Sequence, residues 1–142
     1  MSRLALPRNF PCPCRSEEQD PPRYAACCQP WHDGLAEGRH AATPEALMRS
    51  RYSAYALGLV DYLLATWYPA TAPGDLELPP MKWLGLEVRR AEMAGDAGVV
   101  EFVARCRAPG GKAQRLHEIS RFLREQGRWY YIDGQAPAEA GR

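Results

Sequence analysis

The chain has 142 residues, a formal net charge of +1 and an apolar content of 46%. This length supports one domain of usual size with a small appendage, and the apolar content is ample for a buried core. The near-neutral charge argues against a uniformly basic nucleic-acid-binding protein, and the composition excludes a disordered chain. No apolar run approaches the ~20 residues of a membrane span.

The first residues contain no apolar stretch long enough for a signal peptide, so we expect a cytoplasmic protein with reduced cysteines. Residues 1–11 are expected to be a loosely ordered lead-in. We divide the chain into a lead-in with a metal-binding motif over 1–34 and a second domain over 35–142. The tail at 136–142 is small and polar and is expected to fray.

Four of the five cysteines lie in two close pairs, Cys12-Pro13-Cys14 and Cys27-Cys28. Thiolates this close together are costly unless they share a cation or are oxidised, and four sulfurs from two short segments can surround one tetrahedral Zn²⁺. In a reducing compartment the pattern favours a metal over disulfides. We therefore predict a closed, structural zinc site, which replaces the hydrophobic core that so short a segment cannot build.

Other arrangements of these cysteines stay open. They could form disulfides within the cluster, His32 could replace one sulfur as the fourth ligand, or Cys12 or Cys14 could have a redox role. Thiolates also bind iron, so the sequence does not name the metal. The fifth cysteine, Cys106, shares its strand face with Phe102 and is expected to be a small buried apolar residue.

The middle of the chain has the pattern of helices. Thr43, followed by Pro and Glu, is a typical helix start, with an N-cap hydroxyl and an acid near the positive end of the helix dipole. Apolar and aromatic residues then recur every three to four positions, which predicts helices over 44–57 and 60–66 with a break at Gly58. Residues 69–80 contain four prolines and are expected to form a loop.

From residue 83 onward the apolar period changes to two. This predicts strands in the regions 86–92, 99–106, 116–124 and 129–133, joined by hairpin turns. Helices followed by three or four antiparallel strands form an α+β layout, in which the helical face is buried against one side of a curved sheet.

Several segments together resemble a known family. Residues 12–16 (CPCRS) and 24–28 (YAACC) resemble the SEC-C zinc motif, which also forms the C-terminal tail of the SecA preprotein translocase ATPase. Over nearly the whole chain the sequence resembles the YchJ family of uncharacterised bacterial proteins. The further segments that carry this resemblance are 30–34, 43–55, 61–63, 83–86, 100–104, 117–122 and 129–134.

The resemblance implies a SEC-C knuckle with Cys12, Cys14, Cys27 and Cys28 as zinc ligands. A nuclear-transport-factor-2-like (cystatin-like) domain would follow, with helices packed into the concave side of a bent antiparallel sheet. The implied partners are ribosomal components or protein-handling factors that contact the knuckle, and such domains frequently form homodimers through the open sheet face. Residues 15–22 depart from the usual motif, because this stretch is acidic and longer.

Arg51 lies on or beside the buried face of the first predicted helix, where an unpaired charge would cost several kcal/mol. We expect Glu118 or Asp61 to pair with it and so to fix the helix on the sheet. In the alternative function, Arg51, Tyr55, Asp61 and Glu118, with Trp67, line a cavity for a small anionic or polar ligand.

The sequence leaves two functions open, and each uses a different site. The primary prediction is a zinc-dependent interaction module, and the alternative is a small-ligand binder or an enzyme that uses the cavity. His117 and Glu118 are adjacent in one strand and point to opposite faces, so they do not serve one cavity together. No residue is assigned a catalytic role.

Overall fold

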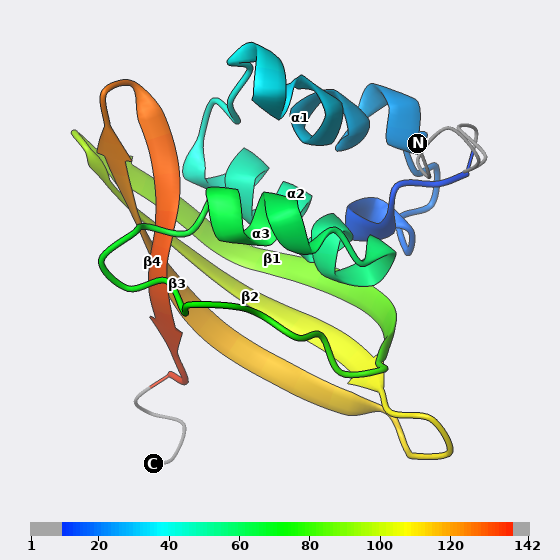
Figure 1. Cartoon of the computed structure of the whole chain (residues 1–142). Coiled ribbons are helices and arrows are strands. Elements are labelled where there is room, and N and C mark those ends of the chain that lie inside the picture. The colour runs from blue at the N-terminus through cyan, green and yellow to red at the C-terminus, as the bar shows by residue number, and fades with distance from the viewer. Residues whose placement is uncertain (1–9, 138–142) are drawn as a thin grey trace.

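The computed structural model describes residues 10–137, where three α-helices are followed by four β-strands (Figure 1). The lead-in expected over 1–11 and the frayed tail expected over 136–142 fall mostly outside the described residues. The elements are α1 (Gln29–Gly34), α2 (Pro44–Leu57), α3 (Val60–Ala65), β1 (Lys82–Ala94), β2 (Ala97–Arg107), β3 (Gln114–Glu125) and β4 (Arg128–Gln135).

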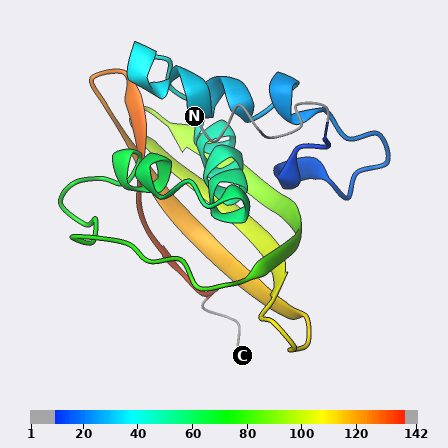
Figure 2. The ribbon, with the colours of Figure 1, turned by 45° about the vertical axis from the view of Figure 1, so that its right-hand side comes forward.

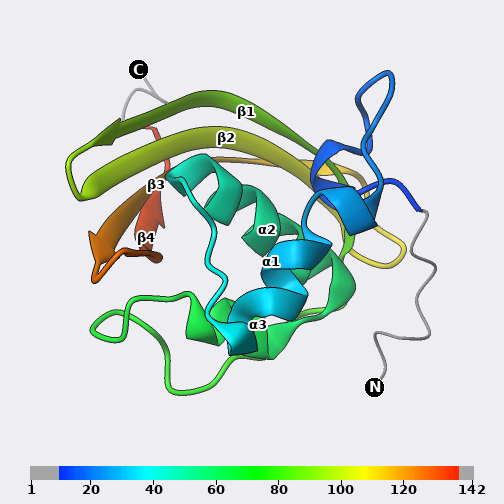
Figure 3. The same cartoon turned by 90° about the horizontal axis from the view of Figure 1, so that it is seen from above.

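The strands form one antiparallel sheet in the order β1-β2-β3-β4, so each strand pairs with its neighbour in sequence. The sheet bends strongly, and the helices lie on its concave side (Figures 1 and 3). Register shifts in β1, between Trp83 and Gly85 and between Val88 and Arg90, locally increase the twist and the bend of this strand. The predicted α+β fold, with helices on a curved antiparallel sheet, is confirmed.

Helix α2 begins and ends where the sequence predicts. The Thr43 side chain accepts a hydrogen bond from the backbone N–H of Ala46 at 3.0 Å, and Pro44 occupies the first turn. Gly58 ends the helix with φ +76°, a left-handed conformation that glycine adopts without steric cost, and its N–H donates to the carbonyl of Ala54. Figure 2 shows this helix in front of the sheet, with the cysteine segment beside it.

The short helix α1 was not predicted. It has six residues, too few for an amphipathic period to show, and it starts directly after Cys28 with Pro30 in its first turn. The same segment buries His32, which is only 5% exposed. The boundary predicted at residues 34 and 35 falls where α1 meets a 3₁₀ turn, and the division into two domains stays a prediction.

The cysteine segment and the sheet share one hydrophobic core. Its α2 contribution includes Leu47 and Tyr52, its sheet contribution includes Phe102 and Trp129, and three of the four N-terminal cysteines belong to the same cluster. A second, smaller cluster packs α2 against α3 through Ala54, Tyr62 and Leu63. Helix α2 therefore lies between the cysteines, the sheet and α3.

Among residues 10–137, no helix is both long enough and apolar enough to cross a membrane.

Gly98 tests the packing of α2 on the sheet. A Cβ atom on this residue would run into the ring of Pro44 at the start of α2 and lie 3.4 Å from the ring of Trp129. We expect Gly98→Ala to lower the free energy of unfolding by about 1–3 kcal/mol, because the rigid proline must move. The measurement is urea unfolding. Gly74→Ala, with nothing within 4 Å of its new Cβ, is the matched control, and equal effects of the two substitutions would contradict this packing.

Candidate metal centre and neighbouring cavity

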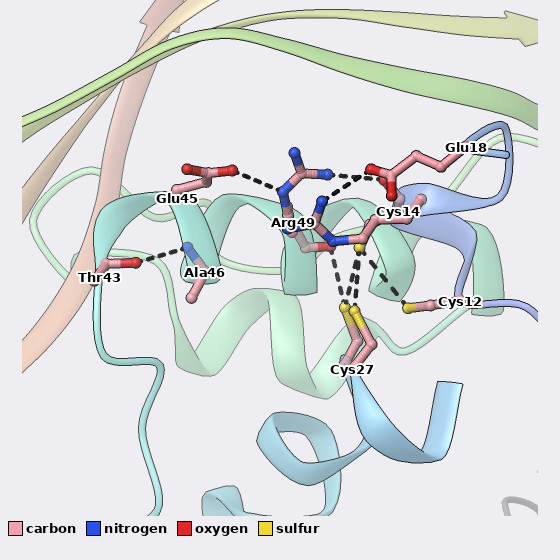
Figure 4. A network of polar contacts seen from close by, with 10 residues as sticks. Cys12, Cys14, Glu18, Cys27, Thr43, Glu45, Ala46 and Arg49 are labelled. Atoms are coloured by element: carbon pink, nitrogen blue, oxygen red, sulfur yellow. Dashed lines mark hydrogen bonds and ion pairs between the residues drawn. The ribbon is translucent and has the colours of Figure 1, made fainter. Parts of the chain in front are cut away.

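The four N-terminal cysteines come together on two short turns. Cys12 precedes and Cys14 lies within the 3₁₀ turn Pro13–Arg15, while Cys27 and Cys28 lie between a second turn, Tyr24–Ala26, and α1. All four Sγ atoms lie within 4.8 Å of one another. Figure 4 shows the sulfurs of Cys12, Cys14 and Cys27 converging beneath α2.

The sulfur spacing fits a tetrahedral metal ion. A tetrahedron with Zn–S bonds of about 2.3 Å has edges of about 3.8 Å. The Sγ atom of Cys14 lies 3.8 Å from that of Cys12, 3.6 Å from that of Cys27 and 3.7 Å from that of Cys28. All five cysteines of the chain are free thiols in the structure, so its geometry favours a metal over disulfides in this cluster.

Without a metal ion, the sulfurs act on one another and shift the pKa values of these thiols in opposite directions. Hydrogen bonds from Cys14, and then from Cys27 and Cys28, lower the pKa of Cys12. A hydrogen bond to Cys12, together with the other two sulfurs and burial, raises the pKa of Cys28. Four thiolates at this spacing therefore need a cation among them.

Helix α2 completes the surroundings of the sulfurs. The buried hydroxyl of Ser53 donates to Sγ of Cys28 at 3.3 Å and lies 3.5 Å from Sγ of Cys12. Arg49 donates through Nη1 to the backbone carbonyl of Cys14 at 3.0 Å and through Nε to Glu45 at 2.9 Å (Figure 4). Around a metal site, contacts of this kind orient the ligand side chains.

His32 is not placed to be the fourth ligand. Its Nε2 lies 2.8 Å from the carbonyl oxygen of Ser50, which can only accept, so Nε2 carries the hydrogen. Its Nδ1 lies 2.7 Å from the hydroxyl of Tyr24, which then donates to it. Both ring nitrogens are engaged, and the imidazole links α1 to α2 instead of facing the sulfurs.

The acidic stretch at 15–22 lies over the edge of the sheet. Arg15 and Glu18 form an ion pair at 2.8 Å, and Glu17 forms an ion pair with Arg105 of β2. Gly85 of β1 permits this approach, because a Cβ atom there would meet the Glu17 carboxylate. Two of the acidic side chains that distinguish this loop are thus used in contacts within the molecule.

The ion pair predicted for Arg51 is wrong. Within residues 10–137 its guanidinium makes no ion pair with any carboxylate, and Asp61 is an exposed residue in the first turn of α3. Instead, Nη1 donates to the carbonyl of Leu63 and to the hydroxyl of Thr66, both at 2.8 Å. Carbonyls in the last turn of a helix have no partner within the helix, so a cation there is favourable.

Aromatic rings supply the rest of the surroundings of Arg51. Its Cζ lies 5.0 Å from the centre of the Trp67 ring and 4.4 Å from that of Tyr131, which gives two cation–π contacts. Tyr55 and Glu118 line a cavity together with Arg51, whereas Trp67 and Asp61 are not part of that lining. The adjacent His117 faces the opposite side of the sheet, where it contacts Glu101 at 2.8 Å.

Some residues around both sites were missed by sequence reasoning. Ser53 is a small polar residue within a predicted helix, and nothing local marks it as a contact of the cysteines. The spacing of four residues between Arg49 and Ser53 places both on one face of α2, and this was the one available signal.

Comparisons with known proteins agree with this architecture. Residues 43–134 match the family model described as YchJ, middle NTF2-like domain. The chain is 55% identical to a UPF0225 protein of Chromobacterium violaceum, over 87% of this chain and 90% of the relative. It is 50% identical to a UPF0225 protein of Deinococcus radiodurans, over 94% and 98%.

Solved structures with this architecture also exist. The solution structure of a SEC-C motif containing protein from Rhodopseudomonas palustris superposes with a TM-score of 0.76 at 38% identity and covers 90% of this chain and 99% of that one. The crystal structure of a SEC-C motif containing protein from Psychrobacter arcticus gives a TM-score of 0.75 at 33% identity, over 89% and 82% of the two chains.

Ser53 provides a test of the surroundings of the sulfurs. We expect Ser53→Ala to weaken zinc binding about 10–100-fold, because the hydrogen bond to Cys28 is lost while the four sulfurs remain. The measurement is competition for zinc with a chromogenic chelator. Ser50→Ala is the matched control, since Ser50 is equally buried on α2 but bonds to Leu47 and Tyr62. An equal loss of affinity in both variants would show a general effect of helix destabilisation.

Proposed function

The chain belongs to the YchJ family, and on this premise we propose that it binds one Zn²⁺ through Cys12, Cys14, Cys27 and Cys28. The observation that carries the proposal is the spacing of 3.6–3.8 Å between Sγ of Cys14 and the other three sulfurs. The metal has a structural role. Four sulfurs fill the tetrahedron, and a closed site leaves no position for a substrate.

The metal holds the N-terminal segment on α2. Cys12, Cys14 and Cys28 are at most 2% exposed and belong to the same core as α2 and the sheet. The contacts of Ser53 and Arg49 join the cysteine turns to this helix. Metal binding therefore contributes directly to the free energy that keeps residues 12–28 in place.

The metal-held segment also contacts a ribosomal or protein-handling partner in this proposal. The support is the SEC-C motif together with the exposure of residues 16–20 and of Arg23 on the side away from the core. Within residues 10–137 the Arg23 guanidinium has no ion pair, whereas the neighbouring acids Glu17 and Glu18 are paired. An exposed arginine without an ion pair among the described residues suits a negatively charged partner such as ribosomal RNA.

Elemental analysis of purified protein tests the metal site. We expect about one zinc per chain, bound by four thiolates. Cys27→Ser should lower zinc affinity at least tenfold, because an oxygen ligand replaces a soft sulfur at the site. Cys106→Ser, which changes the buried cysteine of β2, should keep the full zinc content. Protein without zinc, or equal zinc affinity in the two variants, would contradict the proposal.

Cosedimentation with purified ribosomes tests the partner. We expect the zinc-loaded protein to cosediment and Arg23→Glu to weaken binding about tenfold or more, because like charges then oppose each other at the contact. Arg107→Glu, at the exposed end of β2, is the control and should bind as the wild type does. Absence of the wild-type protein from the ribosome pellet, or equal binding of Arg23→Glu, would overturn this part of the proposal without affecting the metal site.

A further inference from the structure

A cavity of about 220 Å³ opens between α2 and the concave face of the sheet. Its lining contains none of the five cysteines, so it is a second site, independent of the metal. The polar groups that face it come from three elements: Arg51 and Tyr55 from α2, Glu118 and Ser120 from β3, and Tyr131 from β4. The rest of its wall is mostly apolar and aromatic.

Arg51 lines this cavity, and some of its hydrogen-bond donors have no partner among the described residues. The residue is 5% exposed, and its Nη1 is satisfied by Leu63 and Thr66. Its Nε and Nη2 make no hydrogen bond with any of residues 10–137. Buried charge without a counter-ion is costly, and two aromatic rings compensate only part of the cost. A guanidinium edge of this kind matches the two oxygens of a carboxylate.

Glu118 limits the charge that the cavity accepts. Its Oε2 is held by the hydroxyls of Ser120 at 2.8 Å and Tyr131 at 3.3 Å, so this carboxylate is fixed on the sheet side. It would repel a second negative charge on a ligand whose first charge lies against Arg51. The cavity therefore favours a monoanion over a dianion.

The apolar wall and the volume of the cavity indicate the size and the apolar character of the remaining part of the ligand. Tyr52, Trp83 and Phe102 belong to the lining, and Tyr52 and Trp83 pack edge to face with ring centres 5.6 Å apart. The volume lies below the ~300–1,000 Å³ typical of sites for drug-sized molecules. We propose that this cavity binds a small organic monocarboxylate, with its carboxylate on Arg51 and its apolar body against Trp83 and Phe102.

The electrostatics of Arg51 agree with this assignment. Burial lowers the pKa of its guanidinium, and the nearby Tyr55, Tyr131, Tyr62 and Glu118 only partly oppose this effect. A bound carboxylate would oppose it further, so ligand binding and the charged form of Arg51 favour each other.

Titration of the full-length, zinc-loaded protein with benzoate tests the proposal, with benzamide as the neutral analogue and terephthalate as the dianion. Binding is followed by tryptophan fluorescence and by the NMR signals of the Trp83 indole. We expect saturable binding of benzoate that is about tenfold or more tighter than that of benzamide, as charge-assisted hydrogen bonds imply. Terephthalate should bind more weakly than benzoate. No saturable benzoate response, or equal affinities for benzoate and benzamide, would overturn the proposal.

Two variants locate the binding. Ala104→Leu fills the cavity from β2 and should abolish benzoate binding. Arg51→Lys keeps the charge but loses the planar fork, so it should reduce the preference for benzoate over benzamide. Zinc content and the thermal unfolding midpoint verify that each variant is folded. If Arg51→Lys does not fold, the comparison of ligands on the wild-type protein and the Ala104→Leu variant still test the proposal. Unchanged benzoate affinity in folded Ala104→Leu would place benzoate outside this cavity and overturn the proposal.

Discussion

Helix α2 contacts the cysteine sulfurs with one side and the curved sheet with another, and most of the structure depends on this double contact. Ser53 and the backbone carbonyl of Arg49 lie within hydrogen-bond distance of Cys28, while Met48 and Tyr52 of the same helix pack in the main core. The cysteine sulfurs and the cavity therefore both lie against α2. Cys12, Cys14 and Cys28 share the main core with this helix and the sheet.

Arg51 connects α2 to elements that follow it in the chain. It binds the last-turn carbonyl of α3 and stacks on Tyr131 of β4, while the backbone of Tyr131 pairs with that of Thr66 and Tyr68. One buried cation thus joins three elements, and no carboxylate among the described residues forms an ion pair with it. Arg51 also lines the cavity, and the hydrogen bonds that it makes to the described residues use Nη1 alone, so a structural role and a binding role of Arg51 are compatible.

Much of the architecture could be predicted because the signals are local. The N-cap at Thr43 and the break at Gly58 predicted the limits of α2, and the change of period from residue 83 onward indicated the sheet. The two cysteine pairs suggested a metal site for the same reason, since the ligands are close in sequence. Helix α1 was missed because six residues are too short for a period to appear.

The remaining features depend on contacts between distant segments, which a single sequence does not contain. The rule that a buried charge needs a counter-ion led to the wrong partner for Arg51, because backbone carbonyls and aromatic rings can also stabilise a guanidinium. The pairing of Glu17 with Arg105 joins a loop to a strand far along the chain, and neither residue marks the other. The contact of Ser53 with the cysteine sulfurs follows only from the position of α2 in the structure.

X-ray absorption spectroscopy at the zinc edge tests the central claim most directly, because it reports both the metal and its ligands. Four cysteines around one Zn²⁺ predict a first shell of sulfur alone, with four Zn–S distances near ~2.3 Å. A shell that contains nitrogen or oxygen at ~2.0–2.1 Å, in place of one or more sulfurs, would contradict the four-cysteine site.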